Sequence, residues 1–278
     1  MINLEPQHTV ITVNYNSSKF VDILLEGVNR LAELSCRIIV ADNGSRDEDF
    51  RYLVWIAKKW NNVLILPRWQ NEPPSFAHAI ALEHILQFVE TPYVTILDAD
   101  ATFLLRGWDR KLRERMTDNT CVIGSPLCID PNSTTNKHID FPFMFAAMYR
   151  TSLLRGIRNP FLPTPGRGQM GEDTGWRIRE YCRSNGLQGI TFEGRNTRTY
   201  KGGPLGAAVC AEYYLDGELV ASHFGRGSSQ GEAKYFKKLP TIPLISQQIR
   251  RWKGRCEAHI WQEHCRKIIE YQAAKCDG

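Results

Sequence analysis

Two acidic residues, Asp98 and Asp100, directly follow a mostly apolar, β-branched run at residues 94–97 and are separated only by Ala99. Such a run is typical of a strand buried on both faces, and open α/β sheets bind ligands at the carboxyl ends of their strands. Neighbouring carboxylates repel each other unless a proton or a cation relieves them. A hard divalent ion would do so and would also hold a diphosphate. Because an isolated Asp-x-Asp is more often a turn or a helix cap, the other motifs must decide.

The segments before these acids alternate between strand-like and helix-like patterns. We predict strands at residues 9–13, 37–41, 63–66 and 94–97, with amphipathic helices at about 20–31, 50–57 and 75–89. This alternation implies a parallel sheet with right-handed crossovers and helices on both faces. The polar residues that end three of the strands then share one edge of the sheet: Asn14 to Asn16, Asp42, and Asp98 with Asp100.

The segments after Asp100 are less regular. We predict a helix through Leu112 and Met116, short strands at residues 122–123 and 143–150, and a β-hairpin at 209–223 with a type I′ turn at Asp216-Gly217. Residues 126–140 are rich in Asn, Ser, Thr and Pro and are expected to form a loop.

Three stretches resemble the family 2 glycosyltransferases, which have the GT-A fold. Residues 10–16 (VITVNYN) resemble the family's opening strand and Tyr-Asn turn, residues 38–45 (IIVADNGS) its Asp-Asp/Asn-Gly-Ser segment, and residues 97–100 (LDAD) its metal-binding Asp-x-Asp motif. Their order after successive strands carries the resemblance, which extends over about residues 9–231. It implies an α/β fold of the GT-A type, a Rossmann-like αβα sandwich with a mainly parallel sheet.

The resemblance also implies a site for a nucleotide-diphosphate sugar, with a UDP-sugar favoured. Asp42 would contact the base or the ribose, Asp100 would ligate the metal, and Asp98 would contact the ribose or reach the metal through water. His78, in the first turn of the third helix, is either a nucleotide contact or a surface residue. The implied donor-binding residues are Val13, Asn14, Tyr15, Asn16, Asp42, Asn71, Asp98, Ala99, Asp100 and Arg226.

A second acidic segment, Gly171-Glu172-Asp173, precedes a helix that runs through Trp176. The helix dipole favours acids at this position, so capping is the simplest explanation. The segment also resembles the family's Glu-Asp motif, which supplies the base that takes the acceptor's proton. By this resemblance Asp173 is the base, Glu172 orients the acceptor, and Gly171 and Trp176 lie on the acceptor side. The loop at residues 126–140 would also lie near the acceptor.

His223 stands at the exit of the predicted hairpin and resembles the late histidine ligand of several GT-A enzymes. Without the resemblance it would be an ordinary, half-exposed strand residue. With Asp98 and Asp100 it would complete a site for Mn²⁺ or Mg²⁺, and an imidazole ligand suits Mn²⁺ better. The Gly/Ser-rich segment 225–231 could close over the donor, and Arg226 could contact phosphate.

The last segment differs in character from the rest. We divide the chain into a GT-A domain at residues 1–235 and a basic, helical C-terminal extension at 236–278, with a helix at about 245–274. The basic residues could bind an acidic partner, a nucleic acid or an anionic membrane surface. They could equally form the solvated side of a helix that packs on the main domain, which we favour.

The bulk composition is ordinary for a folded protein: 278 residues, 42% hydrophobic residues and a net charge of +5. This charge is too small to indicate nucleic-acid binding by itself. No apolar run approaches the roughly 20 residues of a transmembrane helix, and residues 1–6 do not resemble a secretory signal. The 8 cysteines have no CxxC spacing, so we expect reduced thiols in a cytoplasmic protein.

Together these features predict a metal-dependent, inverting glycosyltransferase that uses a nucleotide-diphosphate sugar. The acceptor hydroxyl could belong to a glycan, a protein, a small molecule or a modified nucleic acid. A nucleotidyltransferase is one alternative, although its usual glycine-rich basic loop is not found at residues 13–17. A catalytically inactive sugar- or nucleic-acid-binding module is another, and the retained carboxylates argue against it.

Overall fold

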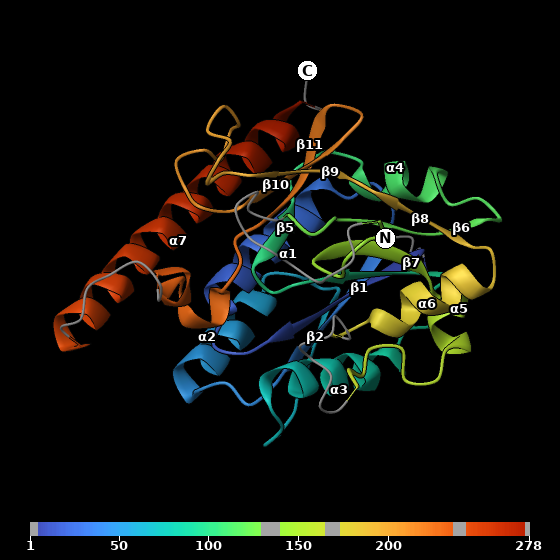
Figure 1. Cartoon of the computed structure of the whole chain (residues 1–278), viewed down its shortest axis with the longest axis horizontal. Helices are drawn as coiled ribbons and strands as arrows, with labels where there is room; N and C mark the ends of the chain where they lie inside the picture. The colour runs from blue at the N-terminus through green and yellow to red at the C-terminus, as the bar shows by residue number, and fades with distance from the viewer. Residues whose placement is uncertain (1–4, 129–139, 165–172, 236–242, 276–278) are drawn as a thin grey trace.

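The computed structural model describes residues 5–128, 140–164, 173–235 and 243–275. The fold is built on a seven-stranded sheet with the order β3-β2-β1-β4-β7-β6-β8 (Figure 1). Neighbouring strands are parallel except for β7, which is antiparallel to both β4 and β6. The strands are β1 His8–Asn14, β2 Cys36–Asp42, β3 Val63–Pro67, β4 Tyr93–Leu97, β6 Thr120–Gly124, β7 Ala146–Arg150 and β8 Gln188–Thr191.

Helices cover both faces of this sheet because its strands are apolar on both faces. Val10 of β1 packs with helices α1 and α7, whereas the next residue, Ile11, packs with helix α3 on the opposite face. This alternation is the period-2 pattern expected for a fully buried strand. The helices are α1 Ser18–Leu31, α2 Asp47–Ala57, α3 Pro74–Leu86, α4 Trp108–Glu114, α5 Thr151–Gly156, α6 Trp176–Ser184 and α7 Pro243–Ala274. The predicted αβα arrangement with a mainly parallel sheet is therefore confirmed.

A second, antiparallel sheet with the order β5-β11-β10-β9 begins immediately after Asp100. Its strands are β5 Ala101–Phe103, β9 Glu193–Asn196, β10 Ala211–Leu215 and β11 Glu218–His223. Asp216 and Gly217, between β10 and β11, both have positive φ, at 51° and 79°. This confirms the predicted type I′ turn, since that turn requires positive φ at both central positions.

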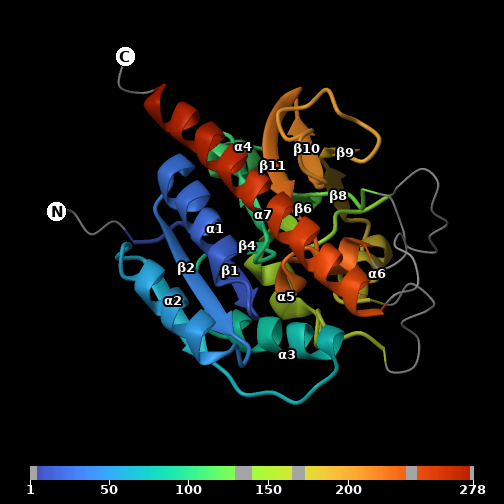
Figure 2. The same ribbon diagram turned by 90° about the vertical axis from the view of Figure 1, so that its left-hand side faces the viewer.

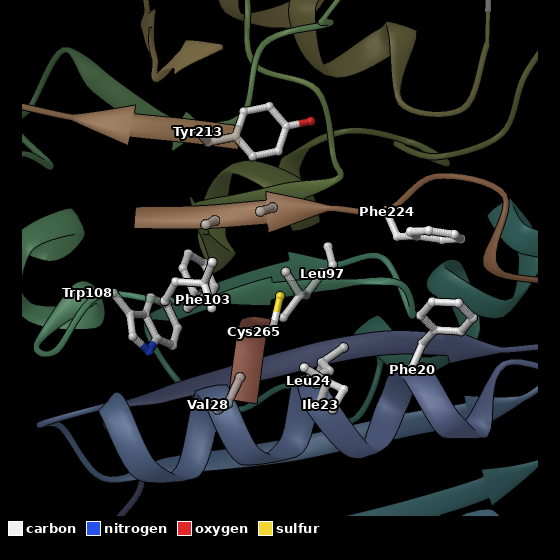
Figure 3. Packing of buried hydrophobic residues seen from close by; sticks show 14 of the residues in the cluster. Phe20, Ile23, Leu24, Val28, Leu97, Phe103, Trp108, Tyr213, Phe224 and Cys265 are labelled. Atoms are coloured by element: carbon white, nitrogen blue, oxygen red, sulfur yellow. The ribbon is translucent and has the colours of Figure 1, made fainter. Parts of the chain in front are cut away.

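The largest core cluster joins the two sheets through α1. Phe103 and Trp108 stack face to face with their centroids 3.6 Å apart, and Phe20 of α1 lies 5.1 Å from Phe224. Cys265 of α7 lies in the same cluster (Figure 3). The C-terminal helix therefore contributes to the same core as the sheet.

Helix α7 runs beside α1 (Figure 2). Trp261 is fully buried, and its Nε1 donates a hydrogen bond of 2.9 Å to Ser222 Oγ on β11. Arg266 donates to Asp22 of α1 over 2.9 Å. α7 thus packs on the main domain, as favoured above, while the proposed boundary at residue 236 lies outside the described residues. In the described part of the chain, no helix is both long enough and apolar enough to span a membrane.

Several predicted boundaries were wrong; strand β7, for example, begins at Ala146 rather than at residue 143. Helix α4 ends at Glu114, so Met116 lies beyond it, because the chain turns at Thr117 to enter β6. Strand β10 begins at Ala211, where its pairing with β9 starts, rather than at residue 209. Of the predicted acceptor loop, residues 129–139 lie outside the described residues.

We predict that Trp261→Ala lowers the free energy of unfolding by about 3–5 kcal/mol, since it removes a fully buried aromatic ring. Trp252→Ala on the same helix is the matched control, because Trp252 is 65% exposed. Its effect should stay within about 0.5 kcal/mol. Urea denaturation followed by circular dichroism measures both. Equal stability of the two variants would contradict the packing described for α7.

Candidate active site

Asp98, Asp100 and His223 are brought together at the carboxyl end of β4. One potential ligand atom from each lies within 4.8 Å of the other two. The acids follow β4 directly, whereas His223 arrives through strand pairing, since β11 pairs with β5 and places His223 opposite Ala101. The predicted metal ligands therefore form one cluster, and the pairing of a three-residue strand with a distant hairpin assembles it.

The charges in this cluster influence one another strongly. His223 Nε2 lies 3.2 Å from Asp100 Oδ1 and 3.5 Å from Asp98 Oδ2. Burial alone would lower the pKa of His223, but the charge and hydrogen bond of Asp100 and the charge of Asp98 outweigh it and raise this pKa. Phe145 stacks on the imidazole with its centroid 4.6 Å away, which fixes the plane of the ring.

The two carboxylates differ in their protonation. Burial raises the pKa of Asp98 to about 7; the charges of Asp100 and Asp173 add to the rise, while His223 opposes it. For Asp100, burial is outweighed by the charge and hydrogen bond of His223 and by the Gly227 N–H, so its pKa is lowered. The negative charge of the pair is thus concentrated on Asp100, whereas Asp98, with a pKa of about 7, exchanges its proton near neutral pH.

The segment after β11 closes against Asp100. The Gly227 N–H donates to Asp100 Oδ2 over 2.7 Å, and the Phe224 N–H donates to the Asp100 carbonyl over 2.8 Å. A Cβ at position 227 would lie 2.6 Å from the Asp100 Cβ, so only glycine fits here. Gly227 belongs to the short 3₁₀ turn η1 Gly227–Ser229, and η2 Glu232–Tyr235 follows.

His78 and Asp173 lie on the other side of Asp98. His78 Nε2 is 3.9 Å from Asp98 Oδ1, and desolvation lowers the pKa of His78 to about 4 despite the charges of Asp173 and Asp100. The Asp173 charge acts on both His78 and Asp98, which places this carboxylate near the cluster. One Asp173 oxygen also accepts the Thr174 N–H over 2.8 Å. Glu172 and Gly171 lie outside the described residues.

The ends of β1 and β2 are joined by a polar network around Asn14. The Asn14 Nδ2 donates to Asp42 Oδ1 over 2.8 Å and to Asp49 Oδ2 over 3.0 Å. The other Asp42 oxygen accepts the Ser45 N–H over 3.2 Å, and Asn16 Oδ1 accepts the Arg46 N–H over 3.0 Å. Asp42 is thus placed at the sheet edge as predicted, with its carboxylate already bound to neighbouring turns.

The remaining predicted donor residues lie around this edge with different accessibility. Tyr15 is 47% exposed, and Arg226 and Asn71 are also exposed. Val13 and Ala99 belong to the buried core, so only their backbone could reach a ligand. Trp176, predicted on the acceptor side, begins α6 and is half-buried.

Sequence reasoning did not select two residues that the structure places at the site. Trp69 is 90% exposed and lines a cavity of about 470 Å³ with Arg68 and Asn71, next to the turn after Asp42. Lys234 carries a charge that acts on Asp100, and burial lowers the pKa of Lys234 to about 7. The sequence could have indicated Trp69, because a tryptophan directly after a predicted strand is a candidate ligand contact. No local sequence pattern indicates Lys234.

Two carboxylates and one imidazole form a donor set that could hold a divalent ion such as Mn²⁺. The raised pKa of Asp98 fits this use, because the ion would replace a proton that the crowded charges now retain.

The fold and this cluster define a glycosyltransferase of the GT-A type. The sequence model described as glycosyl transferase family 2 matches residues 9–172, more than half of the chain. The chain belongs to glycosyl transferase family 2.

Among solved structures, one shares this fold with a TM-score above 0.5, and a second matches more weakly. A mannosyltransferase from Pyrobaculum calidifontis, in complex with GDP-Man and Mn²⁺, is 14% identical, with a TM-score of 0.52 over 98% of this chain and 76% of its own. Glucosyl-3-phosphoglycerate synthase from Mycobacterium tuberculosis, with Mn²⁺ and UDP-glucose, is 12% identical, with a TM-score of 0.48 over 67% of this chain and 69% of its own. A search of curated protein sequences found no match.

We predict that Mn²⁺ binding strengthens as the pH rises through 7. Asp98 must lose its proton, and its pKa is about 7; His223, whose pKa is also raised, must lose one too. Below pH 7, each displaced proton weakens the apparent affinity about tenfold per pH unit. Calorimetry at pH 6, 7 and 8 measures this dependence and the released protons.

Variants test the same site. Asp100→Asn should abolish Mn²⁺ binding, and His223→Gln should weaken it less. Glu218→Gln, at the exposed start of β11, is the control and should bind as the parent does. An affinity that stays constant from pH 6 to pH 8 would contradict the proton exchange.

Proposed function

We propose that the protein is a metal-dependent, inverting glycosyltransferase that moves a sugar from a nucleotide-diphosphate donor, with a UDP-sugar favoured, to an acceptor hydroxyl. The observation that carries this proposal is the meeting of Asp98, Asp100 and His223 within 4.8 Å, with the Asp173 charge acting on the same cluster. The acceptor hydroxyl belongs to a glycan, a protein, a small molecule or a modified nucleic acid.

The donor would bind along the edge formed by the ends of β1, β2 and β4. Tyr15 and Asp42 stand at the ends of β1 and β2 and would receive the nucleoside. Asp98, Asp100 and His223 would hold Mn²⁺ or Mg²⁺, which supplies positive charge to the leaving diphosphate. The Pyrobaculum mannosyltransferase, which shares the fold, was solved with GDP-Man and Mn²⁺, so this fold accommodates a nucleotide sugar and a metal together.

The chain's own groups account for the transfer step. Asp173 would accept the proton of the acceptor hydroxyl while the acceptor oxygen forms its bond to the anomeric carbon. The bond from that carbon to the diphosphate oxygen breaks on the opposite side, and the diphosphate leaves with the bonding electrons. A single displacement of this kind inverts the anomeric configuration.

The remaining groups would keep the reacting parts in place. Phe145 holds the His223 ring by stacking, and the Gly227 N–H holds Asp100. His78, with its pKa lowered to about 4, stays neutral and leaves Asp98 free to change its charge. The buried surroundings strengthen each of these electrostatic contacts.

A panel of nucleotide sugars, including UDP-glucose and GDP-mannose, tests the donor and metal parts of the proposal. Thermal unfolding is followed with and without Mn²⁺. The true donor should raise stability only with the metal, by about 2.7 kcal/mol at a concentration of 100 Kd. Equal binding of a nucleotide diphosphate with and without Mn²⁺ would show that Asp98 and Asp100 have another role.

We predict that Asp173→Asn lowers transfer by about 10²–10⁴-fold, the range for loss of a general base, with little change in donor affinity. The asparagine keeps the size of the side chain but does not accept a proton at neutral pH. Donor calorimetry combined with single-turnover transfer separates the two effects.

Glu172→Gln is the matched comparison and should mainly raise the acceptor KM. If Asp173→Asn transferred normally and Glu172→Gln were inactive, the two roles would be exchanged. Normal transfer by both variants would leave these acids as helix caps and require another base.

A further inference from the structure

A second cavity of about 890 Å³ lies beside the donor edge, between the starts of α1 and α2, the η1 segment and α7. Its size falls within the range of sites for small molecules. The η1 segment separates this cavity from the acidic cluster: Gly227 donates to Asp100, whereas Ser228, Ser229 and Gln230 line the cavity. Gln230 Nε2 also donates to the Asn16 carbonyl over 3.4 Å at the rim.

Four Lys and Arg side chains line this cavity, and one of them, Arg251, pairs with Glu232. The other three come from three different elements: Lys19 on α1, Arg46 just before α2, and Arg255 on α7. Among the described residues, none of the three side chains has an ion-pair or hydrogen-bond partner. Cations without an internal partner are available to an anionic ligand that enters between them.

The acidic residues of the lining are mostly occupied. Asp49 accepts hydrogen bonds from Asn14 and Ser18, and Glu232 pairs with Arg251 over 3.1 Å. Glu48 is exposed in the first turn of α2. The charged side chains of the lining that lack a partner among the described residues are therefore mainly cationic, a set suited to an anion and unsuited to an apolar ligand.

We propose that this cavity binds a small phosphate-bearing ligand separately from the sugar donor. Guanidinium groups match phosphate oxygens in pairs, and Arg46 and Arg255 reach the cavity from separate elements. Since α7 supplies Arg255, the C-terminal extension completes the site. The proposal does not depend on glycosyl transfer or on the metal.

Calorimetry with inorganic pyrophosphate in EDTA tests the site without any metal at the acidic cluster. The parent should bind at one site. Arg255→Gln should raise the Kd at least about tenfold, as expected when a charge-assisted contact is lost. Lys267→Gln is the matched control: an exposed cation on the same helix outside the cavity, whose loss should change the Kd less than about twofold.

Arg46→Gln locates the bound probe. Its side chain reaches the cavity from another element, so its loss should also raise the Kd, whereas a probe over the acidic cluster should bind as it does to the parent. UMP and glucose 6-phosphate, titrated in the same way, distinguish a nucleotide ligand from a sugar-phosphate ligand. Binding of either compound more tightly than pyrophosphate supports the site.

The proposal fails if pyrophosphate does not bind, if Arg255→Gln and Lys267→Gln weaken binding equally, or if Arg46→Gln leaves the Kd unchanged. None of these results bears on transfer, because the titrations contain no donor and no metal. Loss of transfer activity would likewise leave this site unaffected.

Discussion

The repulsion between Asp98 and Asp100 is the constraint on which the rest of the site depends. Both follow one strand by only a few bonds, and partial burial makes each negative charge costly. Compensation comes from the His223 ring, whose pKa these charges raise, and from the Gly227 N–H, which is 127 residues from Asp100 along the chain. The two acids after β4 therefore depend on the second sheet and on the segment after it for the groups that offset their charges.

The C-terminal helix extends this dependence. Trp261 bonds to Ser222, the residue before His223, so the docking of α7 fixes the end of β11. At Gly254 the helix lies directly against the backbone of residues 230–232, where a Cβ would come within 2.6 Å of the Gln230 carbonyl. Helix packing at the far end of the chain thus helps to set the position of a metal ligand.

Much of the first half of the fold could be predicted from the sequence, because its strands and helices have clear local patterns of apolar residues. Asp98 and Asp100 could be predicted for a similar reason, since they directly follow the strand that positions them. His223 was found only through a family resemblance, since the pairing of the three-residue β5 with β11 has no local signal. His78 was left undecided and Lys234 was missed for the same reason, because their proximity to the acids arises from packing between distant segments.

The charges around Asp98 also indicate which further protein groups donor binding would require. Two imidazoles lie near this carboxylate, but His78 is neutral, so only His223 offsets its charge. Asp98 and the His223 ring would have to release their protons to solvent before they could hold a divalent ion, and the two carboxylates would then balance the ion's charge. The diphosphate of a donor would need further cations. Arg226, on the segment that holds Asp100, and the half-buried Lys234, whose charge acts on Asp100, are candidates by their place in the chain.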